Sequence, residues 1–316
     1  MPTLPSGLSN ATGLGVYSPS GSFSDSAFRT ALFDAGIRRL QHYGFSVRES
    51  ARCRGAWHHM SAPAADRVQD LHDLVADPDV HVVLPSIGGH VAAQLLPLID
   101  FDLIAASGTA LFGFSDNSIV PLVTTACTGA VTFHGPCDVT FGFGRFDGEN
   151  YRLSEDNILD VIRHGRFDVG GTVNWRPMQT GAGTGTLLGG NLRAISRLAG
   201  TTWWPDWHGK IMFIEAGDEL HSVEQDLVQL SLAGAFDGLA GMIIGRASRL
   251  PENFYRPEQI APLATLLLDI VGLRDRFPII TEADIGHDVE NVTIPLGVEA
   301  TLLVEGDKIS CKVQVD

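Results

Sequence analysis

Several features that mark other classes of protein are missing from this chain of 316 residues. Basic residues are in deficit, and the formal net charge of −15 argues against nucleic acid or an anionic membrane surface as the main partner. No run of about 18 apolar residues is present to span a bilayer. The N-terminus has no basic stretch followed by an apolar run, so we expect no signal peptide and a cytoplasmic protein.

Cysteine is scarce, and the spacings that would indicate a metal or a dinucleotide are also missing. The four cysteines, Cys53, Cys127, Cys137 and Cys311, are not spaced as in zinc or redox motifs, so we expect free thiols and no metal site. No G-x-G-x-x-G follows the first candidate strand, where SPSGS offers a single glycine. The sequence therefore argues against a dinucleotide-binding enzyme, and we expect no cofactor.

What is present is an ordinary globular composition, 44% hydrophobic and 19% charged, with short apolar runs that alternate with amphipathic stretches. In the first 130 residues we expect strands at 14–17, 45–47, 81–84 and 110–114 and helices at 24–43, 66–76, 91–98 and up to 126. This alternation predicts an α/β fold with a parallel sheet and helices on both faces.

The remainder of the chain divides into a connection and a second α/β unit. Residues 142–184 are rich in Gly, Asp and Arg, with one expected helix at 154–163, and we interpret them as a connection between domains 1–141 and 185–316. In the second domain we expect strands at 210–214, 239–244 and 278–283, a helix at 223–233, and a C-terminal hairpin of 300–304 and 309–315 that turns at Gly306-Asp307.

The segment LFGFSDNS, residues 111–118, follows the pattern of a nucleophile elbow, although it lacks the full G-x-S-x-G motif. A sharp turn after an apolar strand lifts the hydroxyl of Ser115 out of the sheet. It also directs the backbone N–H of Asp116 toward the position where an oxyanion forms. The alternative is that Ser115 or Asp116 only caps the following helix.

A pair of glycines, Gly88 and Gly89, ends another expected strand in the segment LPSIGGH. Glycines at this place allow the backbone to approach a ligand closely and can supply N–H donors. A plain tight turn before a helix is an equally good interpretation.

Two further polar residues end apolar runs: Glu215 in FIEAGDE and His287 in ADIGHD. A serine hydroxyl becomes a good nucleophile when a neighbouring base takes its proton, and a histidine suits that task near neutral pH. A carboxylate then fixes the imidazole tautomer. The sequence therefore indicates a catalytic triad whose members each lie at a strand end: Ser115, Glu215 and His287. His134, in TFHGP, is a rival base whose setting favours a structural role.

At these residues the sequence resembles the LD-carboxypeptidase family of serine peptidases, which includes the microcin C self-immunity peptidases. The resemblance covers nearly the whole chain. Its motifs are YSPSG (17–21), SIGGH (86–90), LLPLIDFDLI (95–104), GFSDNS (113–118), FHGP (133–136), GTLLGGNL (185–192), KIMFIEAGDE (210–219), GMIIGR (241–246) and IGHDVENVTIPLGVEATL (285–302).

Motif by motif, the resemblance implies Ser115 as nucleophile, with Glu215 and His287 completing the triad. It implies an oxyanion hole formed by the N–H groups of Asp116 and of Gly88 and Gly89. The implied fold joins a flavodoxin-like N-terminal half to a smaller C-terminal half of swivelling β/α type, with the site in the cleft between them. Homodimers are common in the family.

The resemblance also implies the reaction, which is hydrolysis of an amide next to a free C-terminal carboxylate. Typical members cut the L–D bond of muropeptide tetrapeptides, whereas immunity-type members act on aminoacyl-nucleotide toxins. The partner is then a small peptide or a peptidyl-nucleotide. A third interpretation is a non-catalytic ligand-binding protein on the same fold.

Three departures from the common pattern bear on the substrate: SIGG in place of an Arg-Gly-Gly, Asn117-Ser118 after the elbow, and Trp175 as the sole tryptophan of the connecting section. Arg246, which follows an apolar strand, either binds the substrate carboxylate or forms a structural ion pair.

Overall fold

The structure is a computed structural model that describes residues 3–9, 11–143, 150–167, 169, 175–216, 220–246, 261–287 and 291–314. The chain forms two compact units: an N-terminal unit of residues 2–167 with 291–297, and a C-terminal unit of residues 168–290 with 298–315. The expected connection at 142–184 lies partly outside the described residues, and its described part contains α6 (Asn150–His164) and β6 (Arg176–Gln179).

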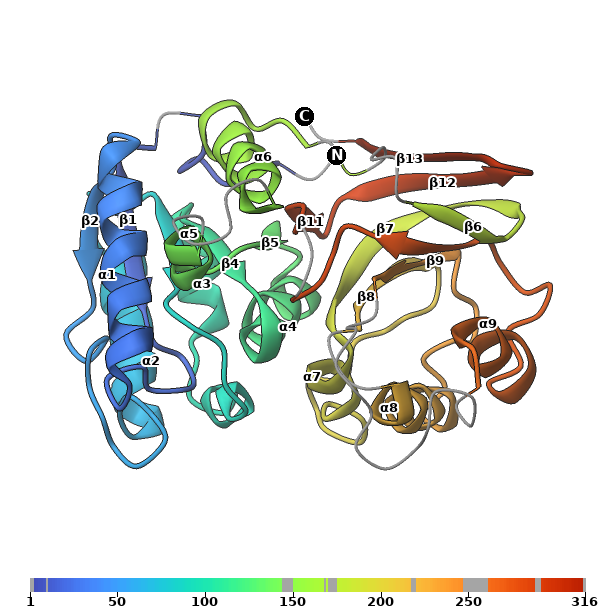
Figure 1. Cartoon of the computed structure of the whole chain (residues 1–316), viewed down its shortest axis with the longest axis horizontal. Helices are drawn as coiled ribbons and strands as arrows, with labels where there is room; N and C mark the ends of the chain where they lie inside the picture. Colours follow the sequence, from blue (N-terminus) through green and yellow to red (C-terminus); the bar gives the residue numbers. More distant parts are fainter. Residues whose placement is uncertain are drawn as a thin grey trace. The chain divides into compact units, whose positions relative to one another are not determined.

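The N-terminal unit is built on one sheet with the strand order β11-β5-β4-β3-β1-β2 (Figure 1). Its strands are β1 (Gly13–Tyr17), β2 (Ser46–Glu49), β3 (Val82–Pro85), β4 (Ala110–Gly113), β5 (Thr132–His134) and β11 (Ile294–Leu296). All neighbours pair in parallel except β11, which is antiparallel to β5. The order 2-1-3-4-5 of the parallel strands is that of flavodoxin-like folds, so the predicted fold class is confirmed.

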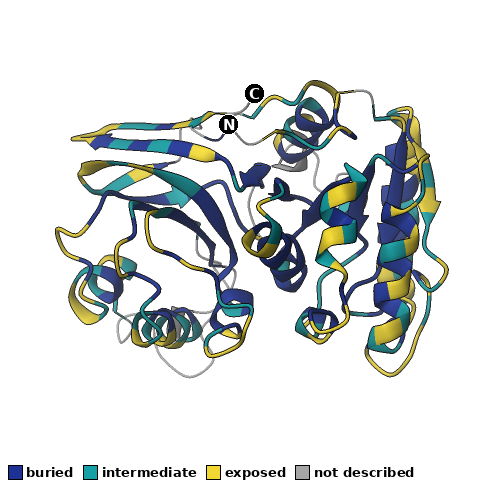
Figure 2. Cartoon of the chain, turned by 180° about the vertical axis from the view of Figure 1, so that it is seen from behind, coloured by how far each residue is buried: buried dark blue, intermediate teal, exposed yellow. Residues whose placement is uncertain are grey.

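Helices connect these strands. They are α1 (Ala27–His42), α2 (Ala64–Val75), α3 (Phe101–Ser107), α4 (Ile119–Thr128) and α5 (Asp138–Phe143), with single 3₁₀ turns η1 (Ala92–Leu95) and η2 (Ser115–Ser118). Helix α1 begins after Ser26, whose hydroxyl accepts a hydrogen bond from the N–H of Arg29. Buried residues recur along it at helical spacing, and the helix packs against α5. Figure 2 shows that the central strands of both units are buried.

The prediction of a helix at 91–98 is wrong. Only the single 3₁₀ turn η1 forms there. Few residues separate Gly89 from Pro97, and proline has no N–H to continue a helical ladder. A segment this short gains too few hydrogen bonds to offset the cost of helix nucleation.

The C-terminal unit is built on a second sheet with the order β13-β12-β7-β8-β9-β10-β6. Its further strands are β7 (Gly181–Asn191), β8 (Lys210–Glu215), β9 (Gly241–Gly245), β10 (Ile279–Ala283), β12 (Glu299–Glu305) and β13 (Lys308–Gln314). Its helices are α7 (Leu192–Ser196), α8 (Leu220–Leu232) and α9 (Leu263–Thr265), the last continued by the π-turn η4 (Leu266–Ile270).

In this second sheet the four strands β7 to β10 run parallel, and antiparallel strands flank them. The predicted C-terminal hairpin is confirmed, with Glu305 paired to Lys308 and Gly306 at a positive φ of 58° in the turn. A smaller β/α unit is therefore present in addition to the flavodoxin-like one, as predicted.

The buried strands explain how both units hold polar residues in fixed places. Strands β1, β3, β4 and β9 are buried along their whole length, as apolar strands covered on both faces are. The backbone of a residue that directly follows such a strand is held in place by the strand, so its polar side chain has a fixed origin. Within the described ranges, no helix has the length and apolar character needed to cross a membrane.

Candidate active site

Ser115 lies at the carboxyl end of β4 in the conformation expected of a nucleophile elbow. Its φ is 56°, a left-handed value that is uncommon for a residue with a side chain and is often found at functional sites. The N-cap positions of η2 and α4 are Phe114 and Ser118, and neither makes a side-chain cap hydrogen bond. Ser115 and Asp116 thus occupy no N-cap position, which disfavours the interpretation that they only cap a helix.

The predicted glycine turn lies directly against this serine, in the same unit. A Cβ atom added to Gly88 would stand 3.1 Å from the Ser115 hydroxyl oxygen and 3.2 Å from its Cβ. The Asn117 side-chain amide holds the preceding residue of the turn by donating to the carbonyl of Ile87 over 2.7 Å. Gly88 is therefore a close-approach glycine, and a side chain at this position would crowd the hydroxyl.

Glu215 and His287 are brought together in the C-terminal unit. His287 Nδ1 lies 2.8 Å from Glu215 Oε1, and the glutamate, the last residue of β8, is completely buried. A carboxylate accepts, so Nδ1 carries the proton in this contact and Nε2 of the neutral ring is left as the basic atom. The imidazole is 38% exposed, which leaves it accessible to a substrate.

Asn191 is a site residue that sequence reasoning missed. It ends β7 in register with Glu215 and donates from Nδ2 to Glu215 Oε2 over 2.5 Å. Its Oδ1 accepts from the N–H of Ala194 at the start of α7, so the amide orientation is fixed from both sides. The signal in the sequence was an Asn that directly follows a strand and precedes a helix, the pattern of an N-cap.

Arg246 is engaged in the structural ion pair that was one of its two expected roles. Its guanidinium lies 2.9 Å from the carboxylate of Asp284, which is 1% exposed, and 3.7 Å from that of Glu282. The indole N–H of Trp175 donates to the other oxygen of Asp284 over 3.2 Å. These contacts connect the ends of β9 and β10 through Asp284. Asp284 precedes His287 by three residues.

Burial distinguishes the rival base and three of the four thiols from His287, which is exposed. His134 is fully buried at the end of β5, with its ring edge-on to Phe114 at 5.6 Å. All four cysteines are free. Burial raises the pKa of Cys137 to about 11 and that of Cys311 to about 12, so neither provides a thiolate near neutral pH.

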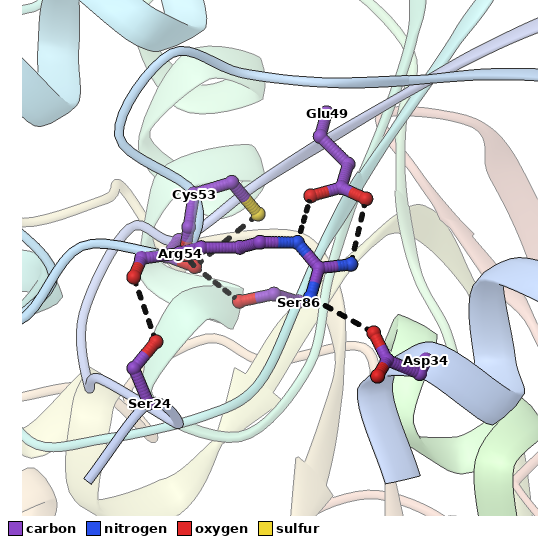
Figure 3. A network of polar contacts seen from close by, with 7 residues as sticks. Ser24, Asp34, Glu49, Cys53, Arg54 and Ser86 are labelled. Carbon is purple, nitrogen blue, oxygen red and sulfur yellow. Dashed lines mark hydrogen bonds and ion pairs between the residues drawn. The ribbon is translucent and has the colours of Figure 1, made fainter. Parts of the chain in front are cut away.

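A second polar cluster lies beside the carboxyl ends of β1 to β3 in the N-terminal unit. Arg54 bridges Glu49 and Asp34, at 2.8 Å to an oxygen of each (Figure 3). The preceding residue, Cys53, is linked through its carbonyl and the hydroxyl of Ser18 to Ser86. These contacts fix the segment that follows β2 against α1.

Asp138, the first residue of α5, belongs to the same neighbourhood. It is completely buried, and within the described residues neither of its carboxyl oxygens has a hydrogen-bond partner. A Cβ added to Gly36 would lie within 2.8 Å of both oxygens, so the carboxyl group packs directly on α1. Burial, and then the negative charges of Glu49 and Asp34, raise the pKa of Asp138 well above its usual value, with Arg54 opposing them.

A serine with left-handed backbone at the end of a parallel strand, and a buried carboxylate on an imidazole in a second α/β unit, are features of the serine hydrolase class. Two family models match the chain: the LD-carboxypeptidase N-terminal domain over residues 14–135 and the LD-carboxypeptidase C-terminal domain over residues 184–302. The chain belongs to the LD-carboxypeptidase family.

Individual relatives span the same length. The chain is 25% identical to the microcin C7 self-immunity protein MccF of Escherichia coli over 338 residues, 96% of each chain. It is 26% identical to the murein tetrapeptide carboxypeptidase of Pseudomonas aeruginosa, over 90% of this chain and 92% of the relative. Among solved structures, an MccF-like protein from Bacillus anthracis superposes with a TM-score of 0.86 at 26% identity, covering 100% of this chain and 99% of the other.

Proposed function

We propose that this protein is a serine carboxypeptidase that hydrolyses an amide next to a free C-terminal carboxylate, with the L–D bond of muropeptide tetrapeptides as its substrate. The observation that carries the proposal is the buried Glu215 bound to His287 Nδ1 at 2.8 Å, in a chain of this family. The relative named murein tetrapeptide carboxypeptidase supports the choice of substrate. By the family resemblance, the protein acts as a homodimer in the cytoplasm.

In the proposed mechanism, Ser115 Oγ attacks the scissile carbonyl carbon while His287 Nε2 takes the hydroxyl proton. Glu215 keeps the imidazole in the required tautomer and stabilises the imidazolium that forms. The N–H groups of Asp116 and of the Gly88–Gly89 turn hold the oxyanion, and each such donor typically lowers the barrier by roughly 3 kcal/mol. His287 then gives its proton to the leaving amine, and water, activated by His287, releases the acyl group from Ser115.

A second candidate substrate is an aminoacyl-nucleotide of the kind that immunity-type members cleave. Two observations favour it: SIGG stands where many LD-carboxypeptidases carry an Arg-Gly-Gly, and the self-immunity protein of Escherichia coli matches over nearly its full length. Against it stands the single tryptophan, Trp175, of the connecting section 142–184, since a nucleobase stacks on aromatic side chains. The indole N–H of Trp175 is, moreover, hydrogen-bonded to Asp284.

The test is turnover of two substrates, a muropeptide tetrapeptide and an acidic aminoacyl sulfamoyl adenosine, by the natural protein and by Ser115→Ala. We expect the natural protein to release D-alanine from the tetrapeptide. We expect Ser115→Ala to lower kcat by several orders of magnitude, since the nucleophile is lost, with an unchanged circular dichroism spectrum.

Cleavage of only the sulfamoyl adenosine would move the proposal to the second substrate. Normal turnover by Ser115→Ala would eliminate the mechanism. A natural protein that binds either compound but cleaves neither would indicate the non-catalytic ligand-binding alternative.

A further inference from the structure

The side chain of Asp116 has a role separate from that of its backbone N–H. Its carboxylate is 6% exposed, and its Oδ2 accepts two hydrogen bonds within the N-terminal unit. One comes from the hydroxyl of Ser20 at 2.7 Å, and the other comes from the backbone N–H of Ala92 at 2.8 Å. The residue after the nucleophile is thus bonded both to the loop that follows β1 and to the first residue of η1, the segment that follows the glycine turn.

Ser20 completes this connection. Its hydroxyl oxygen accepts from the N–H of Val91 at 3.0 Å while it donates to Asp116. A Cβ added to Gly89 would come within 2.3 Å of the same oxygen, so the hydroxyl lies directly on the turn. On the other side of the turn, the N–H of Gly21 donates to the carbonyl of Gly88 over 3.2 Å.

A buried arginine holds the loop that carries Ser20. Arg67 is 1% exposed and donates to the carbonyl of Pro19 at 2.5 Å and to the side-chain oxygen of Gln94, in η1, at 2.6 Å. Burial lowers the pKa of this guanidinium, and the negative charge of Asp116 opposes that shift. Arg67 therefore joins the loop that carries Ser20 to η1, the segment that follows the glycine turn.

We propose that Ser20, Asp116 and Arg67 are positioning residues that hold the Gly88–Gly89 turn at a fixed place relative to the hydroxyl of Ser115. Two consecutive glycines have wide conformational freedom, so the turn does not fix its own geometry. Oxyanion donors lower a barrier only when they are already aimed at the developing charge, and a misplacement of about 1 Å can cost about 100-fold in rate. This inference rests on the proposed hydrolase function.

The test is the kinetics of Ser20→Ala with the substrate that the natural protein cleaves. Since Ser20 touches the turn and not the substrate, we expect kcat to fall about 10- to 100-fold while KM stays unchanged. The rate of labelling by a fluorophosphonate, which also needs the oxyanion donors, should fall by a similar factor.

Ser22→Ala is the matched control. Ser22 is equally buried in the same loop, but its hydroxyl donates to the carbonyl of Gly55 at 2.8 Å, away from the turn. Its kcat should equal that of the natural protein, even if both variants lose similar thermal stability. An unchanged kcat in Ser20→Ala, or an equal fall in both variants, would overturn the proposal.

A further variant keeps the proposal testable if Ser20→Ala does not fold. Asp116→Ala removes the oxygen that accepts from Ser20 and Ala92 but keeps the backbone N–H, and we expect the same loss of kcat without a change in KM. Where Ser20→Ala folds, the loss of log kcat in the double variant should be smaller than the sum of the two single losses, because both changes break one connection. Fully additive effects, or wild-type kcat in Asp116→Ala, would contradict the proposal, whereas an inactive natural protein would refute the hydrolase function itself.

Discussion

At the scale of single residues, the orientation of His287 depends on a chain of two buried groups. Glu215 fixes the imidazole through Nδ1, and Asn191 fixes Glu215 through its second carboxylate oxygen. Asn191 is itself fixed as the N-cap of α7. Because an ionised carboxylate with no exposure is costly unless each oxygen is bonded, the amide is as necessary to this arrangement as the imidazole.

Removal of that amide should therefore affect both activity and stability. We expect Asn191→Ala to lower kcat by about tenfold or more and the free energy of unfolding by about 1–3 kcal/mol, since it leaves an oxygen of buried Glu215 unbonded. The measurements are steady-state kinetics and urea unfolding. Asn191→Ser is the control, because serine still caps α7 but is too short to reach Glu215. Full turnover in Asn191→Ser would contradict this role.

Asp138 provides a pH-dependent prediction at the same scale. Its pKa is raised by burial, so the folded protein holds its proton above about pH 4, where the unfolded chain releases it. The stability that this group contributes is complete below about pH 4 and is lost as the pH rises toward the folded pKa. Asp138→Asn has no such group, so it should be more stable than the natural protein at pH 7, with a gain that shrinks as the pH falls.

Urea unfolding of both proteins between pH 4 and pH 8 measures this difference. A gain in stability that does not vary with pH would show that Asp138 is ionised in the folded protein.

The sequence predicts a site residue when its signal is local, and misses it when its role comes from a distant partner. Ser115, Glu215 and His287 are polar residues at the ends of apolar runs, a local pattern, and the contact between Glu215 and His287 agrees with that pattern. The roles of Asn191, Ser20 and Arg67 depend on partners between 24 and 96 positions away in the sequence. Single-sequence patterns carry no information on such pairings.

At the scale of elements, the edge of the N-terminal sheet that carries Ser115 is made of short segments that follow β1, β3 and β4. The elbow and the glycine turn fit together closely, because a Cβ on Gly88 would be 3.1 Å from the hydroxyl oxygen of Ser115. Substitution at this glycine therefore tests whether the contact between the two segments matters for the reaction.

We expect Gly88→Ala to lower kcat by about tenfold or more, since the added methyl group displaces the hydroxyl by a few tenths of an ångström. Gly135→Ala is the matched control: its Cβ would be equally crowded, 3.1 Å from Thr293 Oγ1, but it touches no proposed catalytic atom. Kinetics and melting temperature of both variants separate crowding from catalysis. Equal activities in the two variants would argue against a catalytic role for the turn.

The composition and length of each strand explain which strands could be predicted from the sequence. Strands β1, β3, β4, β8 and β9 consist mainly of apolar runs, and each of them, like β10, was expected close to its observed bounds. Strands β5 and β11 have three residues each, and β7 carries five glycines among its eleven residues, so none of them has a readable period. These strands form because neighbouring strands pair with them, a tertiary effect that outweighs local propensity.

At the scale of the whole molecule, the chain passes three times between the two units, and residues 291–297, which contain β11, return to the N-terminal unit. The proposed nucleophile belongs to the N-terminal unit, and Glu215 and His287 belong to the C-terminal unit. The proposed mechanism requires Ser115 and His287 to act on one substrate. A test must therefore measure the reactivity of the Ser115 hydroxyl and show that this reactivity requires His287.

That measurement is peptide mapping by mass spectrometry after treatment with a fluorophosphonate, with the labelling rate followed in the natural protein and in His287→Gln. We expect one adduct per chain, on Ser115, and a labelling rate in His287→Gln at least about 100-fold lower, because the serine has lost its base. An adduct on another residue, or an unchanged labelling rate in His287→Gln, would contradict the triad.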